Sequence, residues 1–254
     1  MPRGTFPPIG MRIEIDSLRT LPEIRTGDDL AVLIREAARR EDQLIEASAV
    51  VVVAQKIVSK AEGAVIDLRS VQPSRMAAQW AAEWNKDPRL IEAILMQTRR
   101  IVKMDRGVLI AETRHGFVCA NAGVDQSNAG GKDLALVLPA DPDASAQRLR
   151  EGLGCGAVIV IDTFGRPWRE GLVDVAIGIA GMEPLQDHRG SVDRGGRMLA
   201  STIIAVADQL AAAAGLVMRK ADGCPVALIR GFEWQPGHGS IAALLRSPEQ
   251  DLFR

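Results

Sequence analysis

The sequence predicts an α/β protein built on a mixed sheet. Two uninterrupted β-branched runs, "AVVVVAQ" (49–55) and "GAVIVIDT" (156–163), are typical of strands that are buried on both faces. Segments with helical periodicity alternate with the strands, and several strands follow one another closely enough to pair as antiparallel neighbours. A chain of 254 residues with 47% hydrophobic composition can bury a substantial core, which excludes a disordered protein.

The first elements follow from short local patterns. "MRIEID" (11–16) alternates apolar and polar residues, which predicts a half-buried strand. "LPEIRTGDDL" (21–30) supplies turn residues before a helix at 30–40. The strand at 49–55 then leads into "KIVSKAEG", which we interpret as a polar loop after a buried strand.

Residues 73–100 are predicted to form two helices. The division falls at Asp87-Pro88, because proline disfavours helical geometry in the residue before it. We expect a single domain over residues 1–254, in which a helical subdomain could occupy the region near 70–104.

The second half of the chain continues the alternation of strands and helices. A helix at 201–218 would be capped by its opening Ser and Thr, a loop is expected over "FGRPWREG" (164–171), and the tail 232–254 looks flexible. The remaining predicted elements are strands at 108–112, 116–120, 134–138 and 224–231, and a helix at 143–152, while "VDVAIGIAG" (173–181) is apolar and interrupted by glycines.

Composition excludes several classes of protein. The net charge is −1, from 31 basic and 32 acidic side chains, so neither nucleic acid nor an anionic membrane is an expected partner. No apolar run reaches the length of about 18 residues that a membrane helix needs, and "MPRGTFPPIG" lacks the features of a secretory signal, so we expect a cytoplasmic protein. The three cysteines and three histidines lack metal-site spacing, so any metal should be a hard cation held by oxygen.

The first candidate site is "IVIDTFGRPWREG". A buried strand that ends in Asp162 and Thr163 would place a carboxylate and a hydroxyl at a sheet edge, where both are natural ligands for Mg²⁺ or Mn²⁺. Arg166 and Arg169 follow, and guanidinium groups suit phosphate oxygens. The alternative is an Asx turn that leaves the strand, followed by solvated arginines.

Three further loops are candidates. In "NAGVDQSNAGG" Asp125 could ligate a cation and Asn128 could donate to a base or phosphate, or the segment could be a hairpin connection. In "AQKIVSKAEG" Lys56 and Lys60 could reach a nucleotide phosphate, or be ordinary surface lysines. "KADGCPV" (220–226) is either a fourth site loop or a plain turn.

Familiar nucleotide and hydrolase signatures are missing from the sequence. It contains no GxxxxGK[ST], no GxGxxG that opens a helix and no GxSxG. The residues themselves therefore indicate metal-assisted phosphate chemistry at strand ends, but they do not identify the substrate or the reaction.

Six ordered blocks together resemble one family, the coenzyme F420:L-glutamate ligases. The resemblance covers most of the chain, from about residue 18 to residue 232. The blocks are "LPEI", "AQKIVSKAEG", "HGFVCANAGVDQSN", "LPADPDASAQRLR", "IDTFGRPWREGLVDVAIGIAG" and "VADQLAAAAGLVMRKADGCPVALIRG". The resemblance implies a GTP-dependent amide ligase that adds L-glutamate to the carboxylate of the coenzyme precursor F420-0, and then adds γ-linked glutamate. It also implies Mg²⁺ or Mn²⁺, one or two per site, with K⁺, and an unusual mixed α/β fold in an intertwined homodimer.

The resemblance also implies roles for individual residues. Asp125 and Asp162 would ligate one metal ion and Thr163 a second, Asn128 would contact GTP, and Lys60 would act with the two aspartates in catalysis. The nucleotide site would further include Leu21, Pro22, Glu23, Ile24, Gln55, Lys56, Met218, Arg219, Lys220, Ala221, Asp222, Gly223 and Cys224.

Two positions depart from some relatives. Gln55-Lys56 stands where some have small hydroxyl residues, and Lys220 stands where some have an acid or amide that ligates the second metal. A protonated lysine cannot ligate Mg²⁺. Two alternatives to the ligase therefore stay open: a phosphotransferase that stops at a phosphorylated acid, and a GTP-binding protein of the same fold without turnover.

Overall fold

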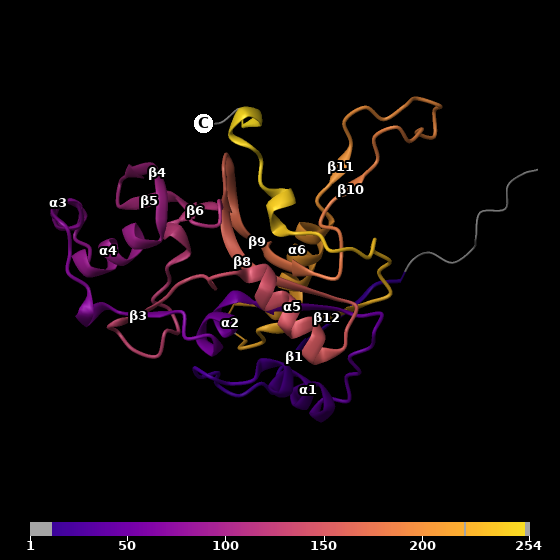
Figure 1. Ribbon diagram of the computed structural model, residues 1–254, viewed down its shortest axis with the longest axis horizontal. Helices are drawn as coiled ribbons and strands as arrows, with labels where there is room; N and C mark the ends of the chain where they lie inside the picture. Colours follow the sequence, from indigo (N-terminus) through magenta and orange to yellow (C-terminus); the bar gives the residue numbers. More distant parts are fainter. Residues whose placement is uncertain (1–11, 221, 252–254) are drawn as a thin grey trace, which may run out of the picture.

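A five-stranded mixed sheet forms the centre of the computed structural model, which describes residues 12–220 and 222–251 (Figure 1). Only β2 and β8 are parallel, and every other neighbouring pair is antiparallel, so the predicted mixed sheet is confirmed. The strand order is β1 (Glu14–Leu18), β12 (Val226–Arg230), β2 (Val50–Ala54), β8 (Ala157–Arg166) and β9 (Arg169–Ala180).

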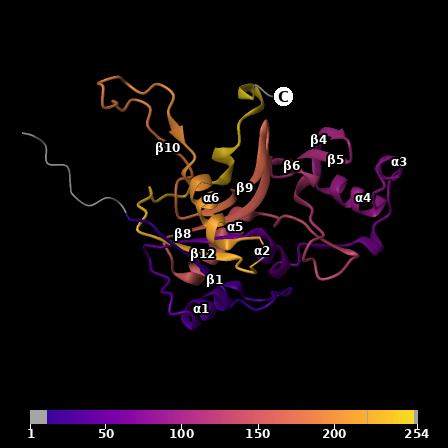
Figure 2. The ribbon, with the colours of Figure 1, turned by 180° about the vertical axis from the view of Figure 1, so that it is seen from behind.

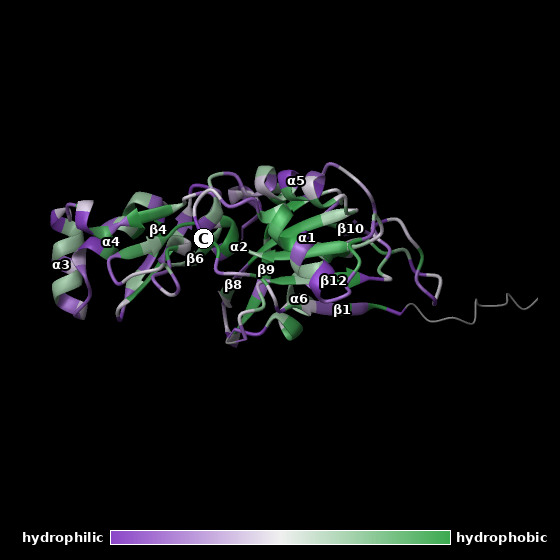
Figure 3. Ribbon diagram, turned by 90° about the horizontal axis from the view of Figure 1, so that it is seen from below, coloured by the Kyte–Doolittle hydropathy of each residue, from purple (hydrophilic) through white to green (hydrophobic). Residues whose placement is uncertain are grey.

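Helices cover both faces of this sheet, which explains the uninterrupted apolar runs. The side chains of residues 50–53 in β2 and 157–160 in β8 are fully buried. Helices α1 (Leu30–Arg40) and α5 (Pro142–Leu153) contact each other on one face, and α6 (Val206–Met218) packs on the other (Figure 3). The helices predicted at 30–40 and 143–152 are confirmed.

A second hydrophobic core lies beside the central sheet (Figure 1). The predicted division of residues 73–100 is confirmed, because Asp87 caps a new helix that has Pro88 at its first position. The elements around this core are β3 (Val65–Asp67), α3 (Arg75–Trp84), α4 (Pro88–Gln97), β4 (Thr98–Asp105), β5 (Val108–Thr113), β6 (Val118–Ala120) and β7 (Leu134–Leu136).

Several predicted boundaries are wrong. The segment 164–171 is not a loop, because β8 and β9 continue through it as a hairpin whose backbone groups pair with each other. The helix predicted at 201–218 begins only at Val206, without a side-chain cap. Its first residues instead form β11 (Ile203–Ile204), which pairs with β10 (Gln186–Asp187) at the base of an arm that projects from the sheet (Figures 1 and 2).

The end of the chain is attached to the central fold. Asp143 of α5 accepts hydrogen bonds from Ser240 Oγ (2.6 Å) and from the backbone N–H of Ile241. The described part of the tail, up to residue 251, is therefore anchored where the sequence suggested flexibility. Among the described residues, no helix combines the length and apolar character needed to cross a membrane.

The N-terminus of α5 offers a test of local stability. Asp141 Oδ1 accepts a hydrogen bond from the backbone N–H of Ala144 at 2.9 Å, which satisfies a donor that the helix leaves unpaired. We expect Asp141→Ala to lower the free energy of unfolding by about 1 kcal/mol. Urea unfolding measures this, with Asp141→Ser as the control that keeps a cap. Equal midpoints for the alanine variant and the parent would contradict the capping role.

Candidate functional site

A polar cavity of about 660 Å³ opens where the parallel pairing of β2 with β8 ends, at Ala54 and Ile161. Its volume lies in the range of small-molecule and cofactor sites, and carboxyl ends of parallel strands are the usual place for them. It collects most of the residues named from the resemblance. These are Leu21, Pro22, Glu23, Ile24, Gln55, Lys56, Lys60, Asn128, Asp162, Thr163, Met218, Arg219, Lys220, Gly223 and Cys224.

The two lysines of the cavity come from a short helix and not from the predicted loop. Helix α2 (Gln55–Ala61) begins directly after β2 and places Lys56 and Lys60 one turn apart on the same face. The Lys60 side chain is only 13% exposed, so it is not an ordinary surface lysine. Its Nζ lies 2.5 Å from Glu23 Oε1, an exposed carboxylate that also lines the cavity. Gln55 is buried, and its Oε1 accepts from Ser59 Oγ at 2.8 Å.

The segment around Asp125 is both a turn and part of the site. Asp125 Oδ1 accepts from the backbone N–H of Ser127 at 2.6 Å, which closes an Asx turn, and Asn128 adopts a positive φ of 58°. Asp125 Oδ2 lies 2.7 Å from Lys56 Nζ. Burial alone would raise the pKa of Asp125, but the bonds from Lys56 and Ser127 outweigh it and the pKa is lowered. The turn therefore presents a carboxylate to the lysine that lines the cavity.

The sequence predicted Asp162 at the end of a strand. In the structure it lies within β8, which continues to Arg166. A register shift in the β8–β9 pairing lies directly before it, between Val160 and Ile161. Burial raises the pKa of Asp162 to about 6, opposed by the backbone N–H of Thr163 and the charge of Lys220, while the charge of Asp125 adds to the rise. The fold thus holds a carboxylate whose negative charge is incompletely compensated.

Thr163 connects three elements of the cavity wall. Its Oγ1 accepts from Lys220 Nζ at 2.6 Å and donates to Asp174 Oδ1 in a short hydrogen bond. Asp174 was missed by sequence reasoning; it lies on β9 directly opposite Thr163 in the strand register. An acid opposite a hydroxyl could have been found only if the hairpin had been predicted. Gly215 of α6 makes room for Asp174, because any Cβ there would collide with its carboxylate.

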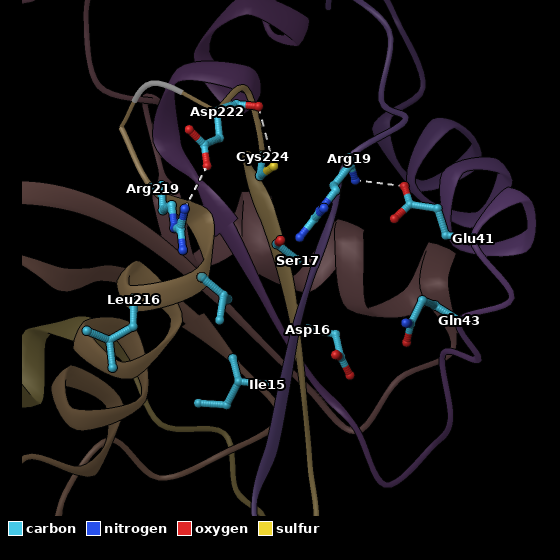
Figure 4. Close-up of a pocket in the computed structure, with 11 residues that line it drawn as sticks. Ile15, Asp16, Ser17, Arg19, Glu41, Gln43, Leu216, Arg219, Asp222 and Cys224 are labelled. Atoms are coloured by element: carbon cyan, nitrogen blue, oxygen red, sulfur yellow. Dashed lines mark hydrogen bonds and ion pairs between the residues drawn. The ribbon is translucent and has the colours of Figure 1, made fainter.

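Some predicted residues lie elsewhere. Arg166 folds back on the β8–β9 turn, where its Nη2 donates to Glu170 O at 2.6 Å, and neither it nor Arg169 lines the cavity. Asp222 lines a separate, second cavity on the far side of Arg219, where the two side chains form an ion pair (Figure 4). Arg219 and Cys224 border both cavities. Ala221 lies outside the described residues.

The oxygen atoms beside β8 suit a hard cation. Asp162 is a half-buried carboxylate whose charge is only partly compensated, and Asp125 is close enough to raise its pKa. The described residues contain no cluster of three or more His, Cys, Asp or Glu side chains placed to hold a metal. Such a pair of carboxylates matches the way proteins bind Mg²⁺, which takes its other ligands from phosphates and water.

The fold and the cavity define a mixed α/β protein that gathers lysines and carboxylates at the ends of parallel strands. Residues 19–231 match the family model described as F420-0:Gamma-glutamyl ligase, so the chain belongs to this family. A protein named Coenzyme F420:L-glutamate ligase from Methanothermobacter thermautotrophicus is 46% identical, over 96% of this chain and 100% of that protein. Proteins of the same name from Methanopyrus kandleri (46% identity, 91% of this chain, 94% of that protein) and Methanocaldococcus jannaschii (43%, 83% and 86%) are also similar.

Proposed function

We propose that the protein is a GTP-dependent ligase in coenzyme F420 biosynthesis, which joins L-glutamate to the carboxylate of F420-0 and then adds γ-linked glutamate. The observation that carries this proposal is the cavity itself. It is lined by Lys56, Lys60, Lys220 and Asp162 where the parallel pairing of β2 and β8 ends, in a chain of the F420-0:Gamma-glutamyl ligase family.

The reaction needs activation of a carboxylate. Resonance and hydration stabilise the anion, so the amine of glutamate cannot displace oxygen from it directly. In the proposed first step a carboxylate oxygen attacks the γ-phosphorus of GTP, which breaks the bond to the β-phosphate oxygen and yields an acyl phosphate and GDP. The glutamate nitrogen then attacks the acyl carbon, loses a proton, and inorganic phosphate leaves. Amide, GDP and phosphate are the products.

The cationic side chains suit the first step. Phosphoryl transfer requires positioning and neutralisation of charge more than covalent chemistry by the protein. Lys60 approaches from α2 with a largely buried side chain, and its partner Glu23 is 74% exposed, so a phosphate can replace that carboxylate at little cost. Lys56 and Arg219 also line the cavity.

Asp125 and Asp162 would hold Mg²⁺ or Mn²⁺ in this account. When bound, the ion would neutralise phosphate charge and orient the phosphate chain. Thr163 offers a further oxygen, although it already accepts a hydrogen bond from Lys220. Stimulation by K⁺ and assembly as a homodimer are implied by the resemblance and stay predictions.

The nucleotide would extend along two backbone segments that line the cavity. These are residues 21–24, and residues 218–220 with 223–225. The side of Leu21 and Ile24 is apolar, which suits a purine ring, and Asn128 can donate to a polar atom of the base or phosphate.

A single incubation tests the proposal. Purified protein is mixed with F420-0, L-glutamate, GTP and Mn²⁺, and product masses are measured together with GDP release. We expect the coenzyme mass to rise in glutamate-sized steps, with GDP formed over many turnovers only when glutamate is consumed. GDP release over many turnovers without glutamate, beyond the one equivalent per enzyme that formation of the acyl phosphate allows, would indicate a phosphotransferase, and GTP binding without any product would indicate a non-catalytic protein. Either result would contradict the ligase.

A further inference from the structure

The Thr163 side of the cavity already contains a positive charge. Lys220 follows the end of α6, after the C-cap residue Arg219, whose φ is positive at 42°. This turn directs the Lys220 ammonium onto Thr163 Oγ1, at 2.6 Å, beside the half-buried Asp162. The ammonium therefore lies among the oxygens that would attract a hard cation.

The Thr163 hydroxyl is oriented for this ammonium. A hydroxyl has one proton, and that of Thr163 goes to Asp174 Oδ1, so its lone pairs are free to accept from Lys220. Asp174 is held opposite Thr163 by the antiparallel register of β8 and β9. The Asp174 carboxylate lies so close to Gly215 that a side chain at position 215 would collide with it. Three elements of the fold thus fix one acceptor and one ammonium together.

A second divalent ion on Thr163 does not fit this arrangement. An oxygen that accepts a hydrogen bond from an ammonium at 2.6 Å is a poor ligand for another cation, since like charges at such a separation repel strongly. Asp162 lies next to Thr163 in the chain, and of Asp125 and Asp162 it is Asp125 that forms an ion pair with a lysine, Lys56. One cation is therefore compatible with the described side chains, and a second is opposed by Lys220.

We propose that Lys220 is a built-in cation of the nucleotide cavity and takes the place of a second divalent ion, so that each chain holds one such ion. This inference rests on the proposed nucleotide site. Asp174 is then a positioning residue, which orients the Thr163 hydroxyl toward Lys220. In the ligase, Lys220 would contribute the charge neutralisation that a second ion would otherwise supply to the phosphates.

The test is the number of Mn²⁺ ions bound by the full-length protein in the presence of a non-hydrolysable GTP analogue. Electron paramagnetic resonance of free Mn²⁺ gives the count without any turnover. We expect one ion per chain for the parent and two for Lys220→Asp, which replaces the ammonium by a ligand. Lys220→Met should keep one ion and raise the Kd of the GTP analogue about tenfold, the effect of one lost charge-assisted contact. Lys86→Asp, an exposed position between α3 and α4, is the matched control and should keep one ion.

Two ions per chain in the parent, or one ion in Lys220→Asp, would overturn the inference. These outcomes differ from failure of the proposed function. A parent that binds two ions and forms glutamylated product is a ligase without a built-in cation. If the parent binds one ion together with the GTP analogue but forms no product, the inference about Lys220 stands and the proposed ligase function is wrong.

Discussion

Replacement of Asp162 by asparagine is expected to reduce GTP-dependent glutamylation about 10²- to 10³-fold, which is the usual loss when one preorganised charge contact with a transition state is removed. The two side chains have the same shape, but the amide cannot supply the negative charge that would hold Mg²⁺ or Mn²⁺ beside the phosphates. The loss should be largest at limiting metal concentration. Steady-state kinetics over a range of Mg²⁺ concentrations measure it.

The same substitution should stabilise the metal-free protein at neutral pH. The pKa of Asp162 is raised to about 6 from an ordinary value of 3.8, so the folded state binds this proton more tightly than the unfolded chain does. The stabilisation is complete below pH about 4 and is lost as the pH rises through about 6. A rise of that size corresponds to at most about 3 kcal/mol, and Asp162→Asn should remove this part of the pH dependence. Thermal unfolding at pH 5 and pH 7.5 with chelator present tests it.

Asp208→Asn is the matched control for Asp162. Asp208 is also a half-buried aspartate with a raised pKa, caused by burial, but it lies on α6 outside the cavity and accepts from the backbone N–H of Ala176. We expect its asparagine variant to keep activity within about threefold, since the amide oxygen still accepts that bond. Near-normal glutamylation by Asp162→Asn at limiting Mg²⁺ would show that the assignment of this carboxylate is wrong.

The second large effect is expected from Lys60→Met. Lys56 and Lys60 both line the cavity and form ion pairs. The Lys60 side chain is the less exposed of the two, at 13% against 28% for Lys56. Removal of one charge-assisted contact with phosphate in a partly desolvated site should lower kcat/KM about 30- to 100-fold, because such contacts contribute about 2 to 3 kcal/mol. Methionine keeps the length and apolar character of the stem, so the fold should be little changed.

Lys86→Met separates this effect from a general loss of charge. Lys86 is exposed and lies between α3 and α4, away from the central sheet, so its variant should keep the parent kcat/KM. Titration of the GTP analogue distinguishes binding from catalysis in the Lys60 variant. An unchanged kcat/KM for Lys60→Met would remove this lysine from the phosphate site.

The central sheet could be predicted because its pattern is strong. Runs of β-branched residues at 49–55 and 156–163 leave few alternatives, and the Asp87-Pro88 step marks a helix boundary directly. Helix α2 was missed because seven residues are too few to show helical periodicity. The strands β10 and β11 were also missed. Each has only two residues, and they are strands because they pair with each other and not because of a local sequence pattern.

The site could be predicted only for those parts that are continuous segments of the sequence. Segments such as 21–24 and 218–224 came from the resemblance, and the cavity brings most of them together. Asp174 could not be found in this way, because its contact with Thr163 depends on antiparallel register across a hairpin that looked like a loop. The Lys220 contact likewise depends on how the end of α6 approaches β8.

The most direct measurement of the central claim uses F420-0 labelled with oxygen-18 in its carboxylate. The protein is incubated with labelled F420-0, L-glutamate, GTP and Mn²⁺, and mass spectra of the coenzyme product and of inorganic phosphate are recorded from the same reaction. The account predicts a glutamylated coenzyme and phosphate that carries oxygen-18, because the acyl phosphate passes one carboxylate oxygen to phosphate. Unlabelled phosphate, or GDP without glutamylated product, would contradict it.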